Sequence, residues 1–225
     1  RYTSKYGITT LGGELRRDEI LSTNLGKTSN QHGAYYKKYD SRTNTSLAAD
    51  HTLTLDKVNL SAGIMFNRSS HESDWYYLPS FSVSYKASDN YKIYASWSKA
   101  MREPTFTDLY YSTVTHSGND LLKTERSENV EVGMNYRNHF MSAYATGYMA
   151  WGKNMIDWIR PLGTTVWESN NLTRVDNIGL ELGVKFQLYG LWNALGEKST
   201  FSIDYVRMHQ GKNAVKEGFE SKYAL

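Results

Sequence analysis

The chain has 225 residues, a net charge of +3 and no cysteine. These values exclude a disulfide framework and a thiolate metal site, and neither a charge excess nor a basic run with interleaved aromatics points to a nucleic-acid partner. Aromatic residues make up 14% of the chain, with 18 Tyr, 7 Phe and 6 Trp against only 3 Pro, which favours strands over helical bundles or disorder.

Alternation of apolar and polar residues predicts a series of β-strands along the whole chain. In chain order they are expected at 7–19, 42–55, 58–69, 75–87, 91–102, 125–137, 141–158, 172–188, 198–209 and from 220 onward. Many exceed the usual strand length of about five or six residues and reach the roughly 9–11 that a tilted strand needs to cross a bilayer. The mean hydropathy of −0.60 is compatible with this interpretation, because only one face of such a strand meets lipid.

The connections between these strands alternate between short and long. Tight turns are expected at Asp56-Lys57, Ser88-Asp89-Asn90 and Asn138-His139, which contain typical turn residues. A longer turn is expected at 189–197, a short link at 70–74, and long loops at 20–41, 103–124, 159–171 and 210–219. An up-and-down path then places nearly all long loops on one side, as in outer-membrane barrels with long extracellular loops and short periplasmic turns.

The two faces of the strands are expected to meet different surroundings. Aromatic residues gather at strand ends, where they predict interfacial girdles: Trp75, Tyr76, Tyr77, Tyr110, Tyr111, Trp151, Trp158, Trp167, Tyr189 and Trp192. Mixed charges predict a wide polar lumen: Glu14, Arg16, Lys86, Lys92, Glu131, Glu181, Lys185 and Asp204. His51 and Arg207 fall on the apolar face, so either they lie near an interface or the register slips there.

No known catalytic motif is present, and none of the six His residues has a second ligand at metal-binding spacing. Glu72 and Asp74 could contact Ca²⁺ on an extracellular loop, although two carboxylates in a short loop are usually only solvated. Asp108 and His116 are the one loop pair that an enzyme could use. No resident cofactor is expected.

The stretch REPTFTDLY, from Arg102 to Tyr110, resembles the R-x-P-x-F-x-[DE]-L-[YF] signature of TonB-dependent outer-membrane receptors. The matching residues are Arg102, Pro104, Phe106 and Leu109, followed by Gly118, Asn119, Leu122 and Glu125 of the loop-closing G-N-x-x-L-x-P-E, then Glu131, Gly179 and Glu181 of the next motifs. Met155-Ile156-Asp157-Trp158 is similar to the strand end of that family. Thr124 replaces the usual Pro, which predicts a looser loop closure.

The resemblance implies a 22-stranded antiparallel transmembrane β-barrel with an N-terminal plug, energised through TonB. The chain is expected to supply about nine or ten strands of it, with the plug and the C-terminal strands outside the sequence. Segments 15–26 and 46–65 resemble the vitamin B12 receptor branch of gut Bacteroidales. The resemblance implies partners in the TonB complex, outer-membrane lipid, a ligand such as cobalamin or a siderophore, and a surface lipoprotein.

Flat aromatic surfaces and hydrogen-bonding groups on the expected extracellular loops are the candidate ligand contacts: Tyr110, Tyr111, His116, Asn119, Trp167 and Asn170. Each has the alternative role of girdle or loop packing. Two other classes of protein stay open at this point, namely an outer-membrane barrel enzyme or adhesin and a soluble β-sandwich that binds a ligand.

Overall fold

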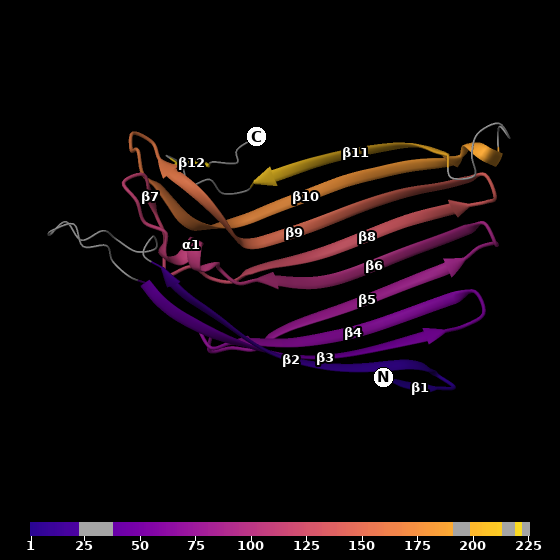
Figure 1. Cartoon of the computed structure of the whole chain (residues 1–225), viewed down its shortest axis with the longest axis horizontal. Helices are drawn as coiled ribbons and strands as arrows, with labels where there is room; N and C mark the ends of the chain where they lie inside the picture. The colour runs from indigo at the N-terminus through magenta and orange to yellow at the C-terminus, as the bar shows by residue number, and fades with distance from the viewer. Residues whose placement is uncertain (23–37, 191–198, 213–218, 222–225) are drawn as a thin grey trace.

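A computed structural model describes residues 1–22, 38–190, 199–212 and 219–221 of the chain, which form one antiparallel-dominated sheet with a short helix (Figure 1). In chain order the elements are β1 (Tyr2–Ser4), β2 (Gly7–Ser22), β3 (Lys38–Thr54), β4 (Val58–Ser69), β5 (Tyr76–Lys86), β6 (Tyr91–Arg102), α1 (Phe106–Tyr110), β7 (His116–Ser117), β8 (Glu125–Arg137), β9 (Met141–Pro161), β10 (Trp167–Gln187), a 3₁₀ turn (Leu188–Gly190), β11 (Thr200–Lys212) and β12 (Phe219–Ser221).

The strands pair in the order β1-β2-β3-β4-β5-β6-β8-β9-β10-β11, the up-and-down path predicted from the sequence. β4, β6 and β8 have the predicted bounds. The short strands β1 and β7 were not predicted. β12 was expected to begin a further barrel strand, but it pairs with the end of β9 instead.

The loop expected at 159–171 was wrong, because β9 continues to Pro161 and β10 begins at Trp167. Pro161 and Gly163 are turn-forming residues that indicated a loop, yet the β9–β10 ladder extends almost to them. Most of the predicted loops 20–41 and 210–219 and of the turn 189–197, including Trp192, lies outside the described residues.

Register divides the sheet into two faces. One cross-strand row contains Leu60, Val83, Ala95, Val132, Gly147 and Leu180, and the row beside it contains Ser61, Ser82, Ser96, Glu131, Tyr148 and Gly179. We call these the apolar face and the polar face. Val132 is 53% exposed and Leu180 42%, so the apolar side chains lie on an outer surface of the sheet rather than in a core.

His51 and Arg207 both stay on the apolar face, opposite Ala62 and Leu180. His51 lies near the end of β3, where its Nδ1 is 2.9 Å from Thr9 Oγ1. Arg207 lies in the middle of β11. The predicted register slip is therefore absent at both positions.

The long connections lie at one end of the sheet and the tight turns at the other, as predicted (Figure 1). We call the end with the long connections the loop end; it carries α1, β7 and β12. We call the opposite end the turn end. At the turn end, Asn138 N donates to Met141 O at 2.9 Å, and Asn138 Oδ1 accepts from the backbone of Phe140 and Met141. Side-chain acceptors of this kind stabilise tight turns.

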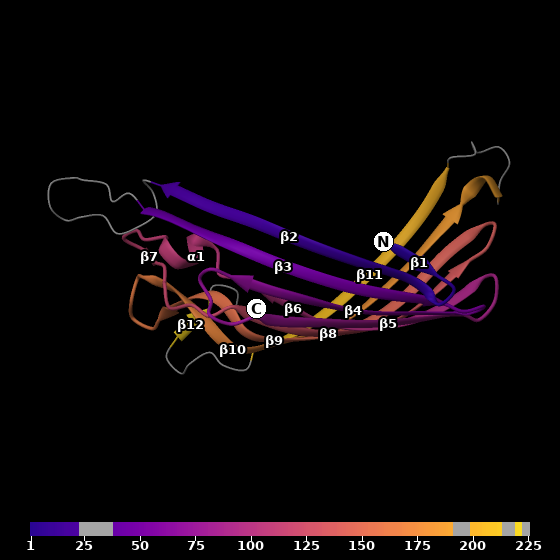
Figure 2. The same ribbon diagram turned by 90° about the horizontal axis from the view of Figure 1, so that it is seen from below.

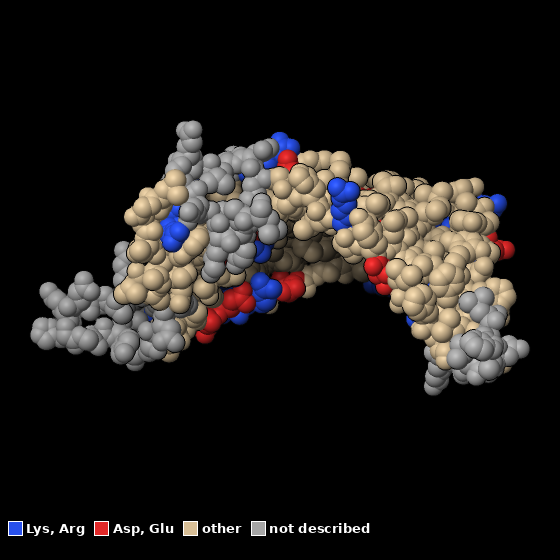
Figure 3. Space-filling view, turned by 90° about the horizontal axis from the view of Figure 1, so that it is seen from above, with Lys and Arg blue, Asp and Glu red and all other residues tan. Residues whose placement is uncertain are grey.

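The sheet curves into an arch, and α1 lies within the arch (Figure 2). Because α1 contacts side chains of the polar face of β3, the polar face lines the hollow. Figure 3 shows this hollow, with acidic and basic residues along its wall. The apolar face is therefore convex.

Buried apolar residues gather at the loop end. Among the described residues they are Tyr76, Leu109, Leu122, Ile159, Leu172 and Val175, and Met155 packs against the last three. Close packing thus supports the loop end, while the rest of the sheet is one layer thick. No helix in the described part of the chain is long and apolar enough to span a membrane.

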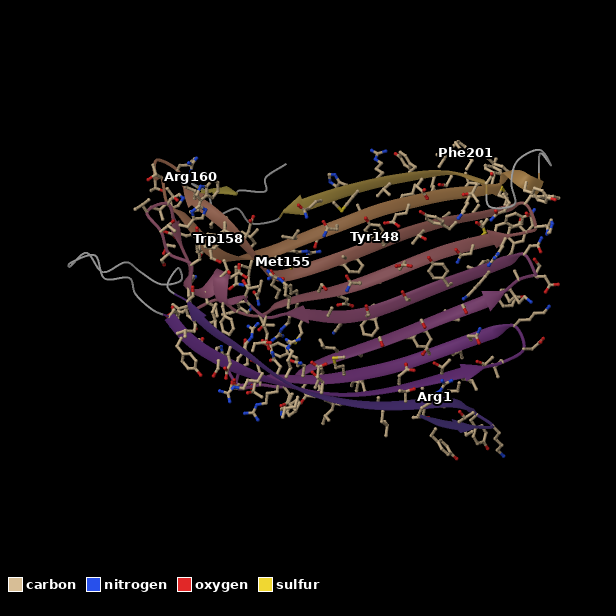
Figure 4. All side chains as sticks on the ribbon, viewed as in Figure 1. Arg1, Tyr148, Met155, Trp158, Arg160 and Phe201 are labelled. Carbon is tan, nitrogen blue, oxygen red and sulfur yellow. The ribbon has the colours of Figure 1, made fainter. Side chains whose placement is uncertain are left out.

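On the polar face, three tyrosine rings lie over glycines of neighbouring strands. A Cβ at Gly133 would meet the ring of Tyr94, and those at Gly179 and Gly183 would meet Tyr148 and Tyr144. Tyr94 Oη reaches Thr146 Oγ1 at 2.9 Å, so its ring spans from β6 across β8 to β9. Figure 4 shows Tyr148 midway along the sheet. These rings cover backbone that glycine leaves bare.

Gly133→Val is expected to destabilise the full-length protein by about 1–3 kcal/mol, because the new side chain displaces the Tyr94 ring and its hydrogen bond. Gly147→Val is the matched control, since Gly147 lies on the apolar face of the adjacent strand with open space around its Cβ. Thermal unfolding of the two variants in detergent is the measurement. Equal effects on the unfolding midpoint would show that the tyrosine cover contributes nothing.

Candidate functional site

An ion pair between the half-exposed Arg102 and the buried Glu125 joins the ends of β6 and β8. Arg102 Nε and Nη2 donate to Glu125 Oε2 and Oε1 at 2.6 and 2.5 Å. Glu125 is 5% exposed, and its Oε1 also accepts from Ile156 N at 2.6 Å. The pairing of β9 with β8 ends just before Ile156, at Lys153. The next residue, Asn154, has a φ of 55°, a backbone conformation that Asn tolerates. The carboxylate supplies the hydrogen bond that β8 no longer provides.

The motif that follows Arg102 forms a helical turn where the sequence predicted an irregular loop. Thr105 Oγ1 accepts from Asp108 N at 3.1 Å, and Asp108 Oδ2 accepts from Thr105 N at 2.9 Å, which is a capping box. The rings of Phe106 and Tyr110 stack with centroids 6.3 Å apart and contact the polar face. Five residues are too few to show a helical period.

Arg42 of β3 holds the start of this turn. Its Nη1 donates to Pro104 O at 2.6 Å, and its Nε lies 3.3 Å from Glu103 Oε2 and 3.4 Å from Asp18 Oδ2. The guanidinium carbon lies 4.9 Å from the centroid of the Phe106 ring. With 12% of its side chain exposed, Arg42 joins strands β2 and β3 to the segment between β6 and α1. Sequence analysis did not single out Arg42 or Glu103.

Tyr110, a predicted ligand contact, is engaged with β3. Its hydroxyl donates to Asp40 Oδ2, and Lys38 Nζ lies 3.9 Å from the ring centroid. His71 Nε2 is 3.3 Å from Asp40 Oδ1. Burial, together with the hydrogen bond to the Asp40 carboxylate, raises the pKa of Tyr110 above its ordinary value, so the phenol stays protonated as a donor.

Gly118 and Asn119 close the loop on α1. Gly118 N donates to Tyr111 O at 2.6 Å, and Asn119 N donates to Asp108 O at 3.0 Å. A Cβ at Gly118 would lie 2.7 Å from Leu109 O, so the close approach requires glycine. Asn119 Nδ2 donates to Ser169 O at 3.2 Å. Asn119 Oδ1 accepts from Leu121 N at 2.9 Å, so both polar atoms of the Asn119 side chain are engaged in loop closure.

The closure is tight also at Thr124, where the sequence predicted loosening. Thr124 is 1% exposed, and its hydroxyl donates to Glu72 Oε1 at 2.7 Å. The side-chain amide of Asn171, on β10, pairs with the backbone of Lys123. Its Oδ1 accepts from Lys123 N at 2.7 Å, and its Nδ2 donates to Lys123 O at 2.9 Å. Hydrogen bonds from Thr124 and Asn171 replace the rigidity that a Pro would give. Asn171 was not recognised as a site residue from the sequence.

The aromatic candidates converge at the outermost part of the loop end. Rings of Tyr111, His116 and Trp158 are in mutual contact, with centroid separations of 5.4 to 6.2 Å. Parallel pairing of β7 with β10 sets His116 opposite Trp167, and the guanidinium of Arg160 lies 5.0 Å from the Trp167 ring. Figure 4 shows Trp158 and Arg160 at this end. The arrangement offers stacking surfaces beside a cation. We call these five residues the aromatic cluster.

The other predicted contacts are more distributed. Asn170 lies on β10 opposite Asp157 and is partly exposed. Tyr110 and Asn119 belong to the loop closure. Trp158 was predicted as a girdle residue and as part of a family strand end, and Arg160 was not singled out, because nothing local indicates that β7 pairs with β10.

A cavity of about 310 Å³ lies between β3, the link after β4 and α1. Its lining includes Asp40, Arg42, His71, Glu72, Glu103, Tyr110 and Asp120. Within the described ranges no group of three His, Cys, Asp or Glu residues has the geometry to hold a metal ion. Glu72, half of the Ca²⁺ candidate, accepts the hydrogen bond of Thr124.

The Asp108 and His116 pair does not form a catalytic arrangement. Asp108 is held by Thr105 and Arg102, and His116 packs its ring in the aromatic cluster, with Nδ1 3.0 Å from Thr115 Oγ1. No hydrogen bond or ion pair joins the two side chains, both of which the structure describes. The loop end therefore presents the stacking surfaces of the aromatic cluster rather than a catalytic pair.

A curved sheet with an apolar convex face, a polar concave face and loops at one end is a segment of an outer-membrane β-barrel. Residues 1–221 match the family model described as TonB dependent receptor-like, beta-barrel, and the chain belongs to this family. The family places the chain in the outer membrane, with the loop end outside.

Curated and solved relatives are receptors and transporters, not enzymes. The vitamin B12 transporter BtuB of Vibrio vulnificus (strain YJ016) is 31% identical over 100 residues, which are 44% of this chain and 16% of that protein. The siderophore receptor PirA from Pseudomonas aeruginosa has a TM-score of 0.74 at 18% identity, covering 94% of this chain and 38% of that one. The FrpB iron transporter from Neisseria meningitidis (F3-3 variant) has a TM-score of 0.62 at 16% identity, covering 93% and 34%.

The chain therefore spans less than two fifths of the length of these relatives. At such identities the two solved structures support the fold alone.

Proposed function

We propose that the full-length protein is an active-transport receptor that binds a scarce small molecule at the loop end and imports it with energy from TonB. Family membership supports this role, and the observation that carries it is the aromatic cluster. The TonB contact would be made through a plug domain in the full-length protein, and a surface lipoprotein is a further proposed partner.

Cobalamin is the proposed ligand. The local identity to a vitamin B12 transporter supports it, as does the resemblance of 15–26 and 46–65 to the vitamin B12 receptor branch of Bacteroidales. Tyr111, His116, Trp158 and Trp167 supply flat apolar surfaces, and Arg160 supplies a donor beside them. A large planar ligand with peripheral amides suits such a surface, because stacking and hydrogen bonding then act together.

The cluster stands on a rigid base, which favours binding by reducing the ordering that a ligand must impose. The base consists of the Arg102–Glu125 pair, the Gly118–Asn119 closure and the Arg42 contacts. A ferric siderophore is the second candidate ligand. Its support is the cationic Arg160 at the edge of the cluster, which suits an anionic iron complex.

Titration of the full-length receptor in detergent with cyanocobalamin and with a ferric siderophore tests the proposal. Trp158→Ala is expected to weaken cobalamin binding roughly 30-fold, equivalent to about 2 kcal/mol, because a central aromatic contact is lost. Trp158→Phe is expected to keep part of the affinity. Trp97→Ala, on the apolar face of β6 and away from the cluster, is the control and should bind as the parent does.

Binding of the siderophore without cobalamin would remove cobalamin and leave the import function intact. Binding of neither ligand, together with a hydrolytic activity, would overturn the import function. Unchanged cobalamin affinity in Trp158→Ala would place the ligand outside the aromatic cluster.

A further inference from the structure

A groove opens where β5 and β6 diverge toward the loop end (Figure 1). β5 pairs with β6 only from Ser80 and Ser98 to the turn end, while β6 continues to pair with β8 as far as Arg102. The resulting cavity of about 310 Å³ is lined mainly by three cations, one acid and four aromatic residues: Lys99, Arg126, Lys153, Glu128, Trp75, Tyr76, Tyr77 and Trp151.

The cations of this groove lie on the convex face. Arg126 pairs with Met101 and with Lys153 in register, and Lys153 pairs with Arg174 on the following strand. Lys99, Arg126 and Lys153 are exposed. Arg126, Lys153 and Arg174 therefore stand in one row on consecutive strands, an arrangement that is unfavourable for a sheet by itself. Lys99 lies one pair further toward the turn end on the same face, opposite Glu128.

Nearby acids are already engaged. Glu128 Oε1 accepts from Trp97 Nε1 at 2.8 Å, and Asp176 pairs with Arg174 at 2.8 Å. Within the described ranges no carboxylate forms an ion pair with Lys99, Arg126 or Lys153. With three cations and Glu128 as the one acid in its lining, the groove carries a net positive charge.

The height of this row along the barrel identifies its surroundings. At the turn end, the rings of Tyr91 and Tyr136 lie 4.7 Å apart on the convex face. Ten residues of β8 separate Tyr136 from Arg126, about 33 Å along the strand, or roughly 25 Å along the barrel axis at the usual tilt. That matches the height of a lipid-facing apolar band. Arg126 and Lys153 therefore stand at the headgroup level of the outer leaflet.

We propose that this groove binds the phosphorylated headgroup of an outer-leaflet lipid. Arg126, Lys153 and Lys99 would contact phosphate oxygens, for which guanidinium and ammonium groups are well suited. Arg126 is held in place by the Tyr76 ring, 4.8 Å from its guanidinium carbon. The acyl chains would run down the apolar face toward Phe81, which is 46% exposed. Basic pockets between membrane-spanning elements bind lipid headgroups in this way.

The test uses the full-length receptor in detergent and a bisphosphorylated, acylated disaccharide lipid, with retained lipid counted by native mass spectrometry. The combined variant Lys99→Gln, Arg126→Gln and Lys153→Gln is expected to bind this lipid at least about tenfold more weakly than the parent. The matched control Lys57→Gln, Lys92→Gln and Lys185→Gln removes equal charge from the turn end and the polar face, and should bind as the parent does.

The dephosphorylated lipid is expected to bind the parent and the combined variant equally weakly, and inorganic phosphate is expected not to displace the lipid. Equal binding of the phosphorylated lipid by parent and combined variant would overturn the proposal. Displacement by inorganic phosphate alone would make the groove a site for free anions instead. Lys153→Gln, an exposed single change, gives the same test with a smaller decrease if the combined variant fails to fold.

Discussion

Replacing Glu125 by alanine is expected to open the loop of residues 103–124 and to lower stability by about 1–3 kcal/mol, because it leaves the Ile156 N–H without its acceptor and the half-exposed Arg102 without its partner. Glu125 is the acceptor for both Arg102 and Ile156 N. It is also the point at which β6, β8 and β9 are joined. We expect hydrogen exchange to rise at the Ile156 amide and through 103–124 in the full-length receptor, while the strands at the turn end stay protected.

Glu168→Ala is the matched control, since Glu168 is exposed on β10 and should change exchange little. Exchange that rises equally at both ends of the sheet would mean that Glu125 supports the whole barrel. Unchanged exchange would mean that the ion pair is dispensable.

Arg42→Met is expected to destabilise the loop end by about 2–3 kcal/mol while keeping most of the apolar packing of the side chain. The substitution leaves the Glu103 carboxylate, 10% exposed, without its cation and removes the donor to Pro104 O. Limited proteolysis between 103 and 124 should accelerate, since cleavage follows the population of the open loop. Ligand affinity should fall with it, because the aromatic cluster loses part of its base.

Arg17→Met removes the same charge on the neighbouring strand. Arg17 is 61% exposed, and its ion pair among the described residues is with Glu19, so the expected effect is below about 1 kcal/mol. Equal proteolysis of the two variants would show that Arg42 acts only through net charge.

The strands were largely predictable from the sequence, because alternation is local and each strand has different surroundings on its two faces. Val58 to Phe66 and Ile178 to Phe186 show the pattern, and the structure keeps both in the predicted register. Two kinds of feature were not predicted correctly from the sequence. α1 and β7 are too short to carry a period, and the predicted loop at 159–171 failed because Pro161 and Gly163 indicate a break that the β9–β10 ladder reaches only at its end.

The family motif of the site was predictable from the sequence, but the geometry of the site was not. Arg102, Pro104 and Glu125 were recognised together, yet Thr124 was expected to loosen a closure that its buried hydroxyl in fact secures. Trp158 was predicted as a girdle residue, and its contact with His116 in the aromatic cluster was not foreseen. The ligand roles of Tyr110, Tyr111, His116, Asn119, Trp167 and Asn170 remain predictions.

The sequence by itself determined the strands, their two faces, the sorting of loops and turns, and the resemblance to TonB-dependent receptors. All of these depend on neighbours within a few residues or on one motif. Only the tertiary structure decided how the loop end closes. Arg42 reaches Pro104 across 62 positions and Glu125 reaches Ile156 across 31, contacts that no local pattern encodes. They form because the curvature of the sheet and the departure of β9 from β8 leave backbone groups that distant side chains satisfy.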